Sequence, residues 1–167
     1  LTSIGKTQMG KCVSAVSNPE NDIVILTNKG RIKYMPINRI PTNATRKPLL
    51  PLMDDEYIVS ILELRDTSSD ILVYTNNGYG KRIQIDTLNK QLSVDASGQF
   101  ILKDYEVSGM FTINPNKPLL VYVTRLGRMR VNQSKFLSAV KKFAEPKPII
   151  KLSPQDDLIA VFCVDKD

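Results

Sequence analysis

The chain repeats one short pattern of apolar and polar residues three times. Each copy has four consecutive apolar residues, most of them β-branched or aromatic, followed by Thr-x-x-Gly. A continuous apolar run that ends in a turn signal predicts a strand buried on both faces. Glycine at the end of the turn fits a left-handed residue that a Cβ would strain. The copies are Ile23–Gly30, Ile71–Gly78 and Leu120–Gly127, and their glycines lie 48 and 49 residues apart.

Polar and apolar residues alternate after each glycine, which predicts the second strand of a hairpin with one exposed face. The second strands are expected at residues 31–37, 81–85 and 128–131. A further apolar strand precedes each hairpin, at residues 12–16, 57–64 and 107–113, and a fourth copy of it lies at residues 158–164. Acidic lead-ins such as Asp54–Glu56 recur before these strands, which indicates structural turns rather than catalytic carboxylates.

The linkers between the repeated strands contain many prolines, which disfavour long helices. Only residues 135–144 show the spacing of a short helix, through Phe136, Val140 and Phe143. One unit is then three or four strands in about 48 residues, the length of one β-propeller blade. Because one such sheet cannot cover both of its own faces, neighbouring blades must pack on it. The predicted fold class is all-β, a propeller-like array of three to four blades.

The whole chain, residues 1–167, is predicted to form a single repeat domain. Its units span approximately residues 12–57, 58–106 and 107–157, and residues 158–167 form a partial unit. The fourth copy ends where the next hairpin would begin. We therefore expect either a partial array or a last strand that closes a ring by pairing with the N-terminal strands.

Composition limits the chemistry open to the chain. It is 42% hydrophobic and 24% charged, as in a folded globular domain. No apolar run approaches the roughly 20 residues that a membrane-spanning helix needs. The sequence has no His, the commonest general base, and its two cysteines are too few for a zinc site. Cys12 and Cys163 are expected to be buried thiols in a reducing cytoplasm, although one disulfide between them is possible.

The net charge of +6 is distributed unevenly along the chain. Residues 1–50 and 101–150 each carry a net +6, whereas residues 51–100 carry −4 and residues 151–167 carry −2. Two basic blocks suggest a polyanionic partner such as nucleic acid. A basic surface that is simply solvated is the alternative.

The repeat resembles the C-terminal domain of DNA gyrase A and that of its topoisomerase IV equivalent, both type IIA topoisomerases. That family repeats an apolar strand, Thr-Asn-x-Gly and a basic strand, with an acidic lead-in to the next unit. Residues 22–33 and 70–85 match this pattern closely, and residues 119–131 match it less well because their turn is Thr-Arg-Leu-Gly. The Gln-Arg-Arg-Gly-Gly-Lys-Gly box of gyrase-type domains has no counterpart in this sequence. The resemblance is therefore to the topoisomerase IV type, or to a divergent phage version, and wrapping of a full supercoil is not expected.

The resemblance implies a β-pinwheel, in which adjacent blades exchange strands and a basic rim binds and bends duplex DNA. Such a domain presents DNA to the cleavage core and is itself non-catalytic, so no catalytic residue, metal ligand or cofactor is expected here. The parent protein would be an ATP-dependent type IIA DNA topoisomerase in the cytoplasm, associated with the nucleoid. The implied partners are double-stranded DNA, the breakage–reunion domain of the same polypeptide and the ATPase subunit, with no membrane contact.

Sequence-independent binding of DNA requires cations arrayed on a surface where they reach phosphates. Arg31 and Lys33 lie two residues apart on a predicted strand and so share a face, as do Arg128 and Arg130. Other cations lie in the adjoining turns and linkers. The predicted DNA-binding residues are Lys29, Arg31, Lys33, Arg39, Arg46, Lys47, Lys81, Arg82, Arg125, Arg128, Arg130, Lys135, Lys141 and Lys142.

Two other classes of function are compatible with the repeat. A propeller-type protein-interaction module would share the fold without binding nucleic acid. A small enzyme on a β scaffold would need a nucleophile paired with a base, and no such pair is identifiable in this sequence.

Overall fold

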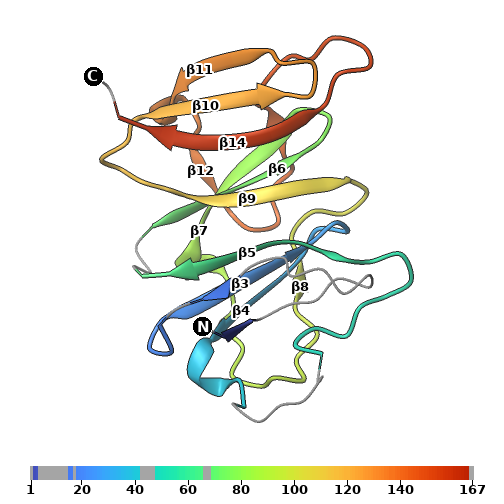
Figure 1. Ribbon diagram of the computed structural model, residues 1–167, viewed down its shortest axis with the longest axis vertical. Helices are drawn as coiled ribbons and strands as arrows, with labels where there is room; N and C mark the ends of the chain where they lie inside the picture. Colours follow the sequence, from blue (N-terminus) through green and yellow to red (C-terminus); the bar gives the residue numbers. More distant parts are fainter. Residues whose placement is uncertain (1, 4–14, 17, 42–47, 66–68, 166–167) are drawn as a thin grey trace.

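The computed structural model describes residues 2–3, 15–16, 18–41, 48–65 and 69–165 (Figure 1). Regular structure in these ranges consists of β-strands and three short 3₁₀ turns. The predicted all-β class is therefore confirmed. A two-stranded sheet joins β1 (Thr2–Ser3) to β2 (Ala15–Val16), and three larger sheets make up the rest.

Each of the three larger sheets is built on one of the predicted hairpins. The hairpin strands are β3 (Asp22–Thr27) with β4 (Arg31–Pro36), β6 (Asp70–Thr75) with β7 (Tyr79–Gln84), and β10 (Leu119–Thr124) with β11 (Met129–Gln133). Gly30, Gly78 and Gly127 close the turns with φ of 75°, 84° and 77°. These values lie in the left-handed region, so the predicted role of glycine is confirmed.

The lead-in strand of each unit pairs with the hairpin of the unit before it. These strands are β5 (Ile58–Leu64) on β3, β9 (Val107–Ile113) on β6 and β14 (Leu158–Val164) on β10, all antiparallel. Each sheet therefore combines strands from two successive units. Because β14 completes the third sheet, the described part of the last strand pairs with β10 and does not close a ring with the N-terminal strands.

Two of the sheets also carry short outer strands. These strands come from the linker that follows the hairpin of the next unit. In the first sheet β8 (Gln99–Phe100) pairs with β4, and in the second β12 (Ala139–Val140) and β13 (Lys147–Pro148) pair with β7. In the third sheet, by contrast, no strand of the described ranges pairs with the outer edge of β11.

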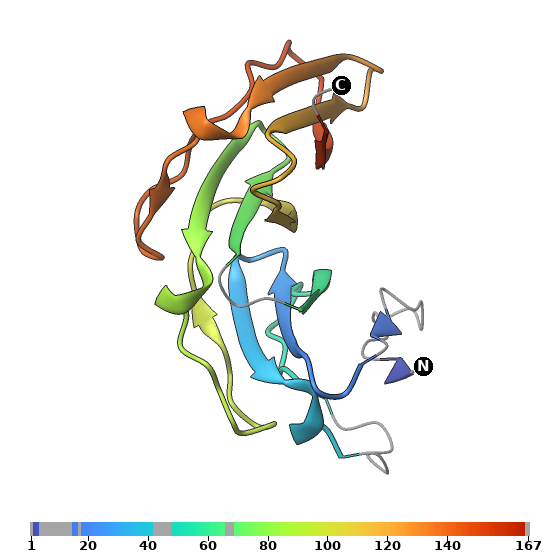
Figure 2. The same cartoon turned by 90° about the vertical axis from the view of Figure 1, so that its left-hand side faces the viewer.

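The three sheets stack along the long axis of the molecule, with β5, β9 and β14 on one side and the outer strands on the other (Figure 2). Alternate residues of each strand face opposite neighbours. Val24 and Ile32 of the first sheet pack with Ile71 and Ile83 of the second. Leu72 and Tyr74 of the second sheet pack in the same way with Leu120 and Tyr122 of the third. The prediction that neighbouring blades bury one another's faces is confirmed.

Residues 135–144 do not form the predicted helix. They contain the end of the 3₁₀ turn η3 (Ser134–Phe136) and strand β12. Phe136 and Phe143 are exposed, so their helix-like spacing faces no core. The segment is instead held extended on β7, where Val140 pairs with Ile83.

Candidate nucleic-acid interface

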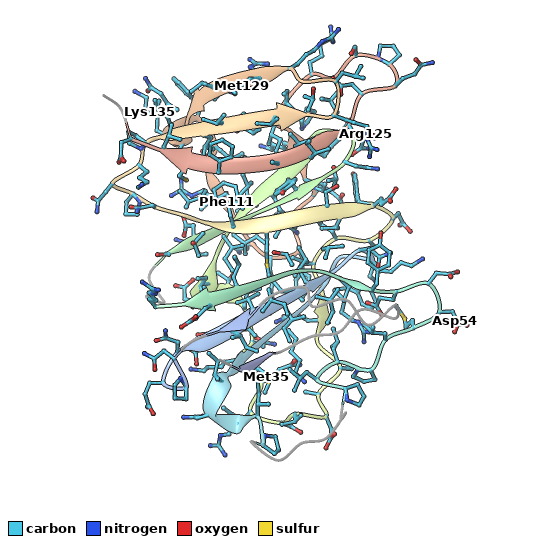
Figure 3. The ribbon with its side chains drawn as sticks, in the orientation of Figure 1. Met35, Asp54, Phe111, Arg125, Met129 and Lys135 are labelled. Atoms are coloured by element: carbon cyan, nitrogen blue, oxygen red, sulfur yellow. The ribbon has the colours of Figure 1, made fainter. Side chains whose placement is uncertain are left out.

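The strands of all three sheets run across the long axis of the molecule, so the strand ends gather on two opposite sides, left and right in Figure 1. At one end, to the right in Figure 1, lie the Thr-x-x-Gly turns and the acidic lead-ins, and we call it the hairpin-turn end. At the opposite end lie the 3₁₀ turns η1 (Ile37–Arg39), η2 (Ile85–Thr87) and η3, and we call it the 3₁₀ end. Figure 3 shows Asp54 and Arg125 at the hairpin-turn end and Lys135 at the 3₁₀ end.

Arg31 is not the surface cation that the alternating pattern predicted. Its side chain is buried and forms an ion pair with Glu56, in which Nη2 lies 2.5 Å and Nε 2.9 Å from the two carboxylate oxygens. Nη1 also donates to the carbonyl of Ser97 at 2.8 Å and Nη2 to that of Pro51 at 2.5 Å. Burial alone would raise the pKa of Glu56, but hydrogen bonds from Arg31 and other donors outweigh it and hold that pKa below its usual value.

Lys33 is fully buried, so the prediction that it lies on the surface was also wrong. Its ammonium donates to the carbonyls of Leu49 at 2.5 Å and Val94 at 2.6 Å. Leu49 belongs to the linker that follows the first hairpin, and Val94 belongs to the linker that follows the second. Burial lowers the pKa of Lys33.

Lys81 of the second hairpin occupies the same place in its unit and is buried in the same way. Its ammonium donates to the carbonyls of Ile101, Lys142 at 2.5 Å and Ala144 at 2.9 Å. Burial lowers its pKa to about 8, against the opposing effect of the Glu145 carboxylate. Arg82 is mostly internal too, because Nε lies 2.5 Å from Asp70 and Nη1 donates to the Leu137 carbonyl at 3.2 Å.

The physical reason for these corrections is the covering linker. Linker segments of the same unit and of the following unit lie against β4 and β7 and supply the backbone carbonyls that the buried cations bind. The alternating polar residues on these strands therefore contact the linkers inside the molecule and do not form an exposed face. Arg130 of β11, which lacks such a cover in the described structure, and Arg128 just before that strand are exposed as predicted.

Exposed cations at the hairpin-turn end stand among many carboxylates. Lys29 and Arg125 are exposed as predicted, but Arg125 Nε lies 2.9 Å from Asp157. Lys103, Arg128 and Lys151 are further exposed cations at this end. The exposed acidic residues described there are Asp54, Asp55, Asp104 and Glu106. This end therefore presents mixed charge to a polyanion.

The 3₁₀ end carries fewer exposed carboxylates. Arg39 in η1 and Lys135 in η3 are exposed at equivalent turns of the first and third sheets. Three more cations that were not singled out from the sequence lie at this end, namely Arg65 after β5, Lys90 after η2 and Lys117 before β10. Lys90 lies 2.6 Å from Asp22 and Lys117 3.3 Å from Asp165. The exposed acidic residues described here are Glu20, Asp86 and Asp165.

The signal that identifies these additional cations is topological. In antiparallel sheets the start of one strand and the ends of both its neighbours share an edge. Arg65 follows the last residue of β5 and Arg39 lies in the turn after β4, and because both strands pair with β3, the two residues lie at the same edge of the sheet. A search confined to the strand after each glycine misses such residues.

The remaining predicted cations lie in linkers. Lys141 is exposed, whereas Lys142 is partly buried and donates to Asn89 Oδ1 and Gln99 Oε1, both at 3.1 Å. Arg46 and Lys47 lie outside the described residues.

In the described ranges no group of three or more His, Cys, Asp and Glu side chains is placed to hold a metal ion. No helix in those ranges is long and apolar enough to cross a membrane.

Comparisons with known proteins agree with the geometry. Residues 21–64 and 69–92 match the family model of the DNA gyrase C-terminal domain, a β-propeller. The fold is similar to the C-terminal domain of DNA topoisomerase IV, with 18% identity and a TM-score of 0.75 over 98% of this chain and 54% of that one. No curated protein matches the chain.

Two further solved structures are similar over most of the chain. The C-terminal domain of ParC from E. coli has 17% identity and a TM-score of 0.70, over 89% of this chain and 64% of that one. The DNA gyrase A C-terminal domain has 16% identity and a TM-score of 0.70, over 94% and 59%. The chain thus spans between 54% and 64% of the length of these three structures.

Proposed function

Because the resemblance to the C-terminal β-pinwheel domain of DNA gyrase A and of its topoisomerase IV equivalent is confirmed, we propose that this chain binds and bends duplex DNA. In this proposal it is a non-catalytic domain of an ATP-dependent type IIA topoisomerase and presents DNA to the cleavage core. Its partners are duplex DNA, the breakage–reunion domain of the same polypeptide and the ATPase subunit. It acts in the cytoplasm, on the nucleoid.

The observation that carries this proposal is the recurrence of exposed cations at the 3₁₀ end. Arg39 and Lys135 occupy equivalent turns of the first and third sheets, and Arg65 and Lys90 lie with Arg39 on the first sheet, beside the start of β3. Packed sheets are spaced about 10 Å apart, so the cations of the first and third sheets lie roughly 20 Å apart and reach separate phosphates of one duplex, whereas the turn η2 of the second sheet carries Asp86. The larger number of carboxylates makes the hairpin-turn end the poorer surface for DNA.

Bending follows from contacts spread along the stack. Bending a site by 40–90° costs on the order of 1–6 kcal/mol, which additional phosphate contacts offset. A single cluster of cations would hold DNA without this compensation, whereas cations on both the first and the third sheet gain contacts as the duplex bends toward them.

Two charge-reversal variants test the assignment of the surface. The first combines Arg39→Glu, Arg65→Glu and Lys135→Glu at the 3₁₀ end. The second combines Lys29→Glu, Lys103→Glu and Arg125→Glu at the hairpin-turn end and changes the net charge by the same amount. Fluorescence anisotropy with a labelled duplex, over a range of salt concentrations, measures affinity and its salt dependence.

We expect the first variant to bind duplex roughly tenfold or more weakly and to lose roughly 3 from the slope of log K against log salt, since each lost phosphate contact removes about 0.9. The second variant should bind more nearly like the unmodified chain and keep its slope. Equal weakening by both variants would refute the assigned surface. Absence of duplex binding by the unmodified chain at moderate ionic strength would refute the proposed function and favour a protein-interaction module.

A further inference from the structure

Two phenylalanines in the linker of the third unit face solvent. Phe136 is 77% and Phe143 71% exposed, more than any other large hydrophobic side chain of the described ranges. We propose that these rings are a stacking site for unpaired bases of single-stranded nucleic acid, whose phosphates bind the neighbouring lysines. We call Lys135, Phe136, Lys142 and Phe143 the Lys-Phe site. The site does not depend on the proposed binding of duplex DNA.

Phe136 occupies the last position of the 3₁₀ turn η3. The last positions of η1 and η2 are Arg39 and Thr87, so the aromatic ring is particular to the third unit. Arg39 is exposed and Thr87 is partly exposed, although linkers cover the outer edges of their sheets. Exposure at this position is therefore a property of the turn and does not result from the uncovered edge of β11.

Phe143 lies in the turn between β12 and β13, on the outer side of the second sheet. The residue before it supplies a carbonyl to the buried lysine of β7, as Val94 supplies one to Lys33 of β4. Phe143 therefore corresponds to Asp95, which is exposed as well. The second unit thus has polar residues at both positions where the third unit has phenylalanine.

A lysine accompanies each ring. The ammonium of Lys135 lies 5.3 Å from the ring centroid of Phe136, and that of Lys142 lies 5.1 Å from the ring centroid of Phe143. The corresponding pairs in the second unit are Asp-Thr and Val-Asp. The third unit therefore carries two cations and two rings where the second carries two carboxylates and no ring.

An exposed ring beside an ammonium matches the two parts of a nucleotide. Bases stack on aromatic side chains and phosphates bind nearby cations, and proteins that bind single strands repeat this combination along the strand. In a duplex the faces of each base are covered by its neighbours, so an unpaired base is the better partner for an exposed ring. An apolar protein surface would instead have to desolvate the two ammonium groups, which is costly.

The path of the linker spaces the two rings along one strand. It runs down the outer side of the molecule, from η3 on the third sheet to β12 and β13 on the second (Figure 2). Phe136 and Phe143 are separated by at most roughly 25 Å of extended chain. At about 3.4 Å per nucleotide this distance corresponds to no more than roughly seven nucleotides. Lys141 lies between the rings in sequence and is exposed, so it adds a third cation.

A labelled single-stranded oligonucleotide of about 12 nucleotides is the probe, since one such module binds roughly 4–16. Fluorescence anisotropy compares the unmodified chain with Phe136→Leu and Phe143→Leu combined, a variant that keeps the charge and the apolar character. This variant should bind the single strand about tenfold or more weakly, because two stacking contacts are lost. Its salt dependence should be unchanged, because no cation is removed.

Binding of a duplex of the same length provides the internal comparison. The double variant should bind duplex like the unmodified chain, so failure of the Lys-Phe site and failure of duplex binding are separate results. Leu92→Ala, which removes a 57% exposed side chain from the corresponding linker of the second unit, should leave single-strand binding unchanged.

Ring signals in NMR spectra distinguish stacking from simple charge attraction. The oligonucleotide should move the ring-proton signals of Phe136 and Phe143 upfield and leave those of Phe111 in place. No binding of the single strand at moderate ionic strength, or equal affinity for the double variant and the unmodified chain, overturns the proposal. Ring shifts caused by an acidic peptide with aromatic side chains, but not by the oligonucleotide, would assign the rings to a protein partner and also overturn it.

Discussion

At the scale of single residues, buried cations link the repeated units to one another. Arg31, Lys33 and Lys81 each bind carbonyls from two linkers, so that each holds successive units together. A buried charge is tolerated only where it is paired or fully hydrogen-bonded, and these carbonyls meet that requirement. Cations that sequence periodicity places on the surface therefore serve the fold in the first two sheets.

One pair of positions shows how the repeat varies its interior contacts. Arg31 and Glu56 form an ion pair in the first unit. In the second unit these positions hold Tyr79 and Tyr105, whose ring centroids lie 5.9 Å apart. The turn and the lead-in are in contact in both units, but through an ion pair in one and through aromatic rings in the other. Recurring charges in the sequence therefore do not reveal that the two pairs of positions are equivalent.

The low pKa of Lys81 predicts a pH dependence that Lys81→Met removes. In the folded chain its pKa is about 8, whereas the ordinary value is 10.5. Between these values the unfolded lysine keeps a proton that the folded one has released, so raising the pH favours folding. The free energy of unfolding of the unmodified chain, relative to that of Lys81→Met, should rise from pH 8 to 10.5 and stay level below pH 8.

Urea unfolding followed by circular dichroism at several pH values measures this difference. Lys33 also has a lowered pKa but is present in both proteins, so the comparison isolates Lys81. A difference that stays level from pH 8 to 10.5 and falls only above pH 10.5 would show that the three carbonyls stabilise the charged ammonium more than burial destabilises it.

At the scale of elements, the sequence predicts the hairpins well because their signals are local. Four apolar residues and a turn glycine specify β3, β6 and β10, and each glycine has the expected positive φ. The exposed face predicted for β4 was wrong because its cover comes from residues 94–102, far away in the sequence. Long-range cover of this kind leaves no trace in the periodicity of the covered strand.

The candidate interface was predictable to the same extent. Arg39 and Lys135 follow hairpin strands directly, and their exposure agrees with the prediction. Arg65 and Lys90 follow other elements, and only the antiparallel pairing of β3 with β5 and the ion pair of Lys90 with Asp22 place them at the 3₁₀ end. The hairpin pattern is the strongest in the sequence, but the cations that it predicts on β4 and β7 are internal.

Alanine substitution at the turn glycines separates backbone strain from docking. Gly127→Ala should cost roughly 1–2 kcal/mol, the penalty of the left-handed conformation alone. Gly30→Ala adds a clash with Leu102 and the loss of two hydrogen bonds to the Gly30 carbonyl, so it should cost roughly 3 kcal/mol or more. Urea unfolding measures both free energies. Equal costs would contradict the docking of residues 101–102 on this turn.

At the scale of the whole molecule, the three sheets stack with the same orientation. Their 3₁₀ turns therefore lie on one side of the stack and their hairpin turns on the other. Inner strands β5, β9 and β14 lie next to one another, and the linkers cross between units on the outer side (Figure 2). Strand sharing between units fixes the relative orientation of the sheets. It therefore also fixes the spacing of the cations at the 3₁₀ end, which a flexible chain of separate domains would not do.

The central claim is that this stack binds and bends duplex DNA along its 3₁₀ end, and end-to-end energy transfer tests it most directly. A duplex of about 24 base pairs, roughly 80 Å long at 3.4 Å per base pair and well below the persistence length of about 150 base pairs, carries a donor and an acceptor at its two ends. Binding of the unmodified chain at low salt should bring the ends closer and increase energy transfer. Arg39→Glu, Arg65→Glu and Lys135→Glu together should abolish the increase at the same protein concentration. Binding that leaves energy transfer unchanged would contradict bending, and an undiminished increase with the triple variant would contradict the 3₁₀ end as the surface responsible.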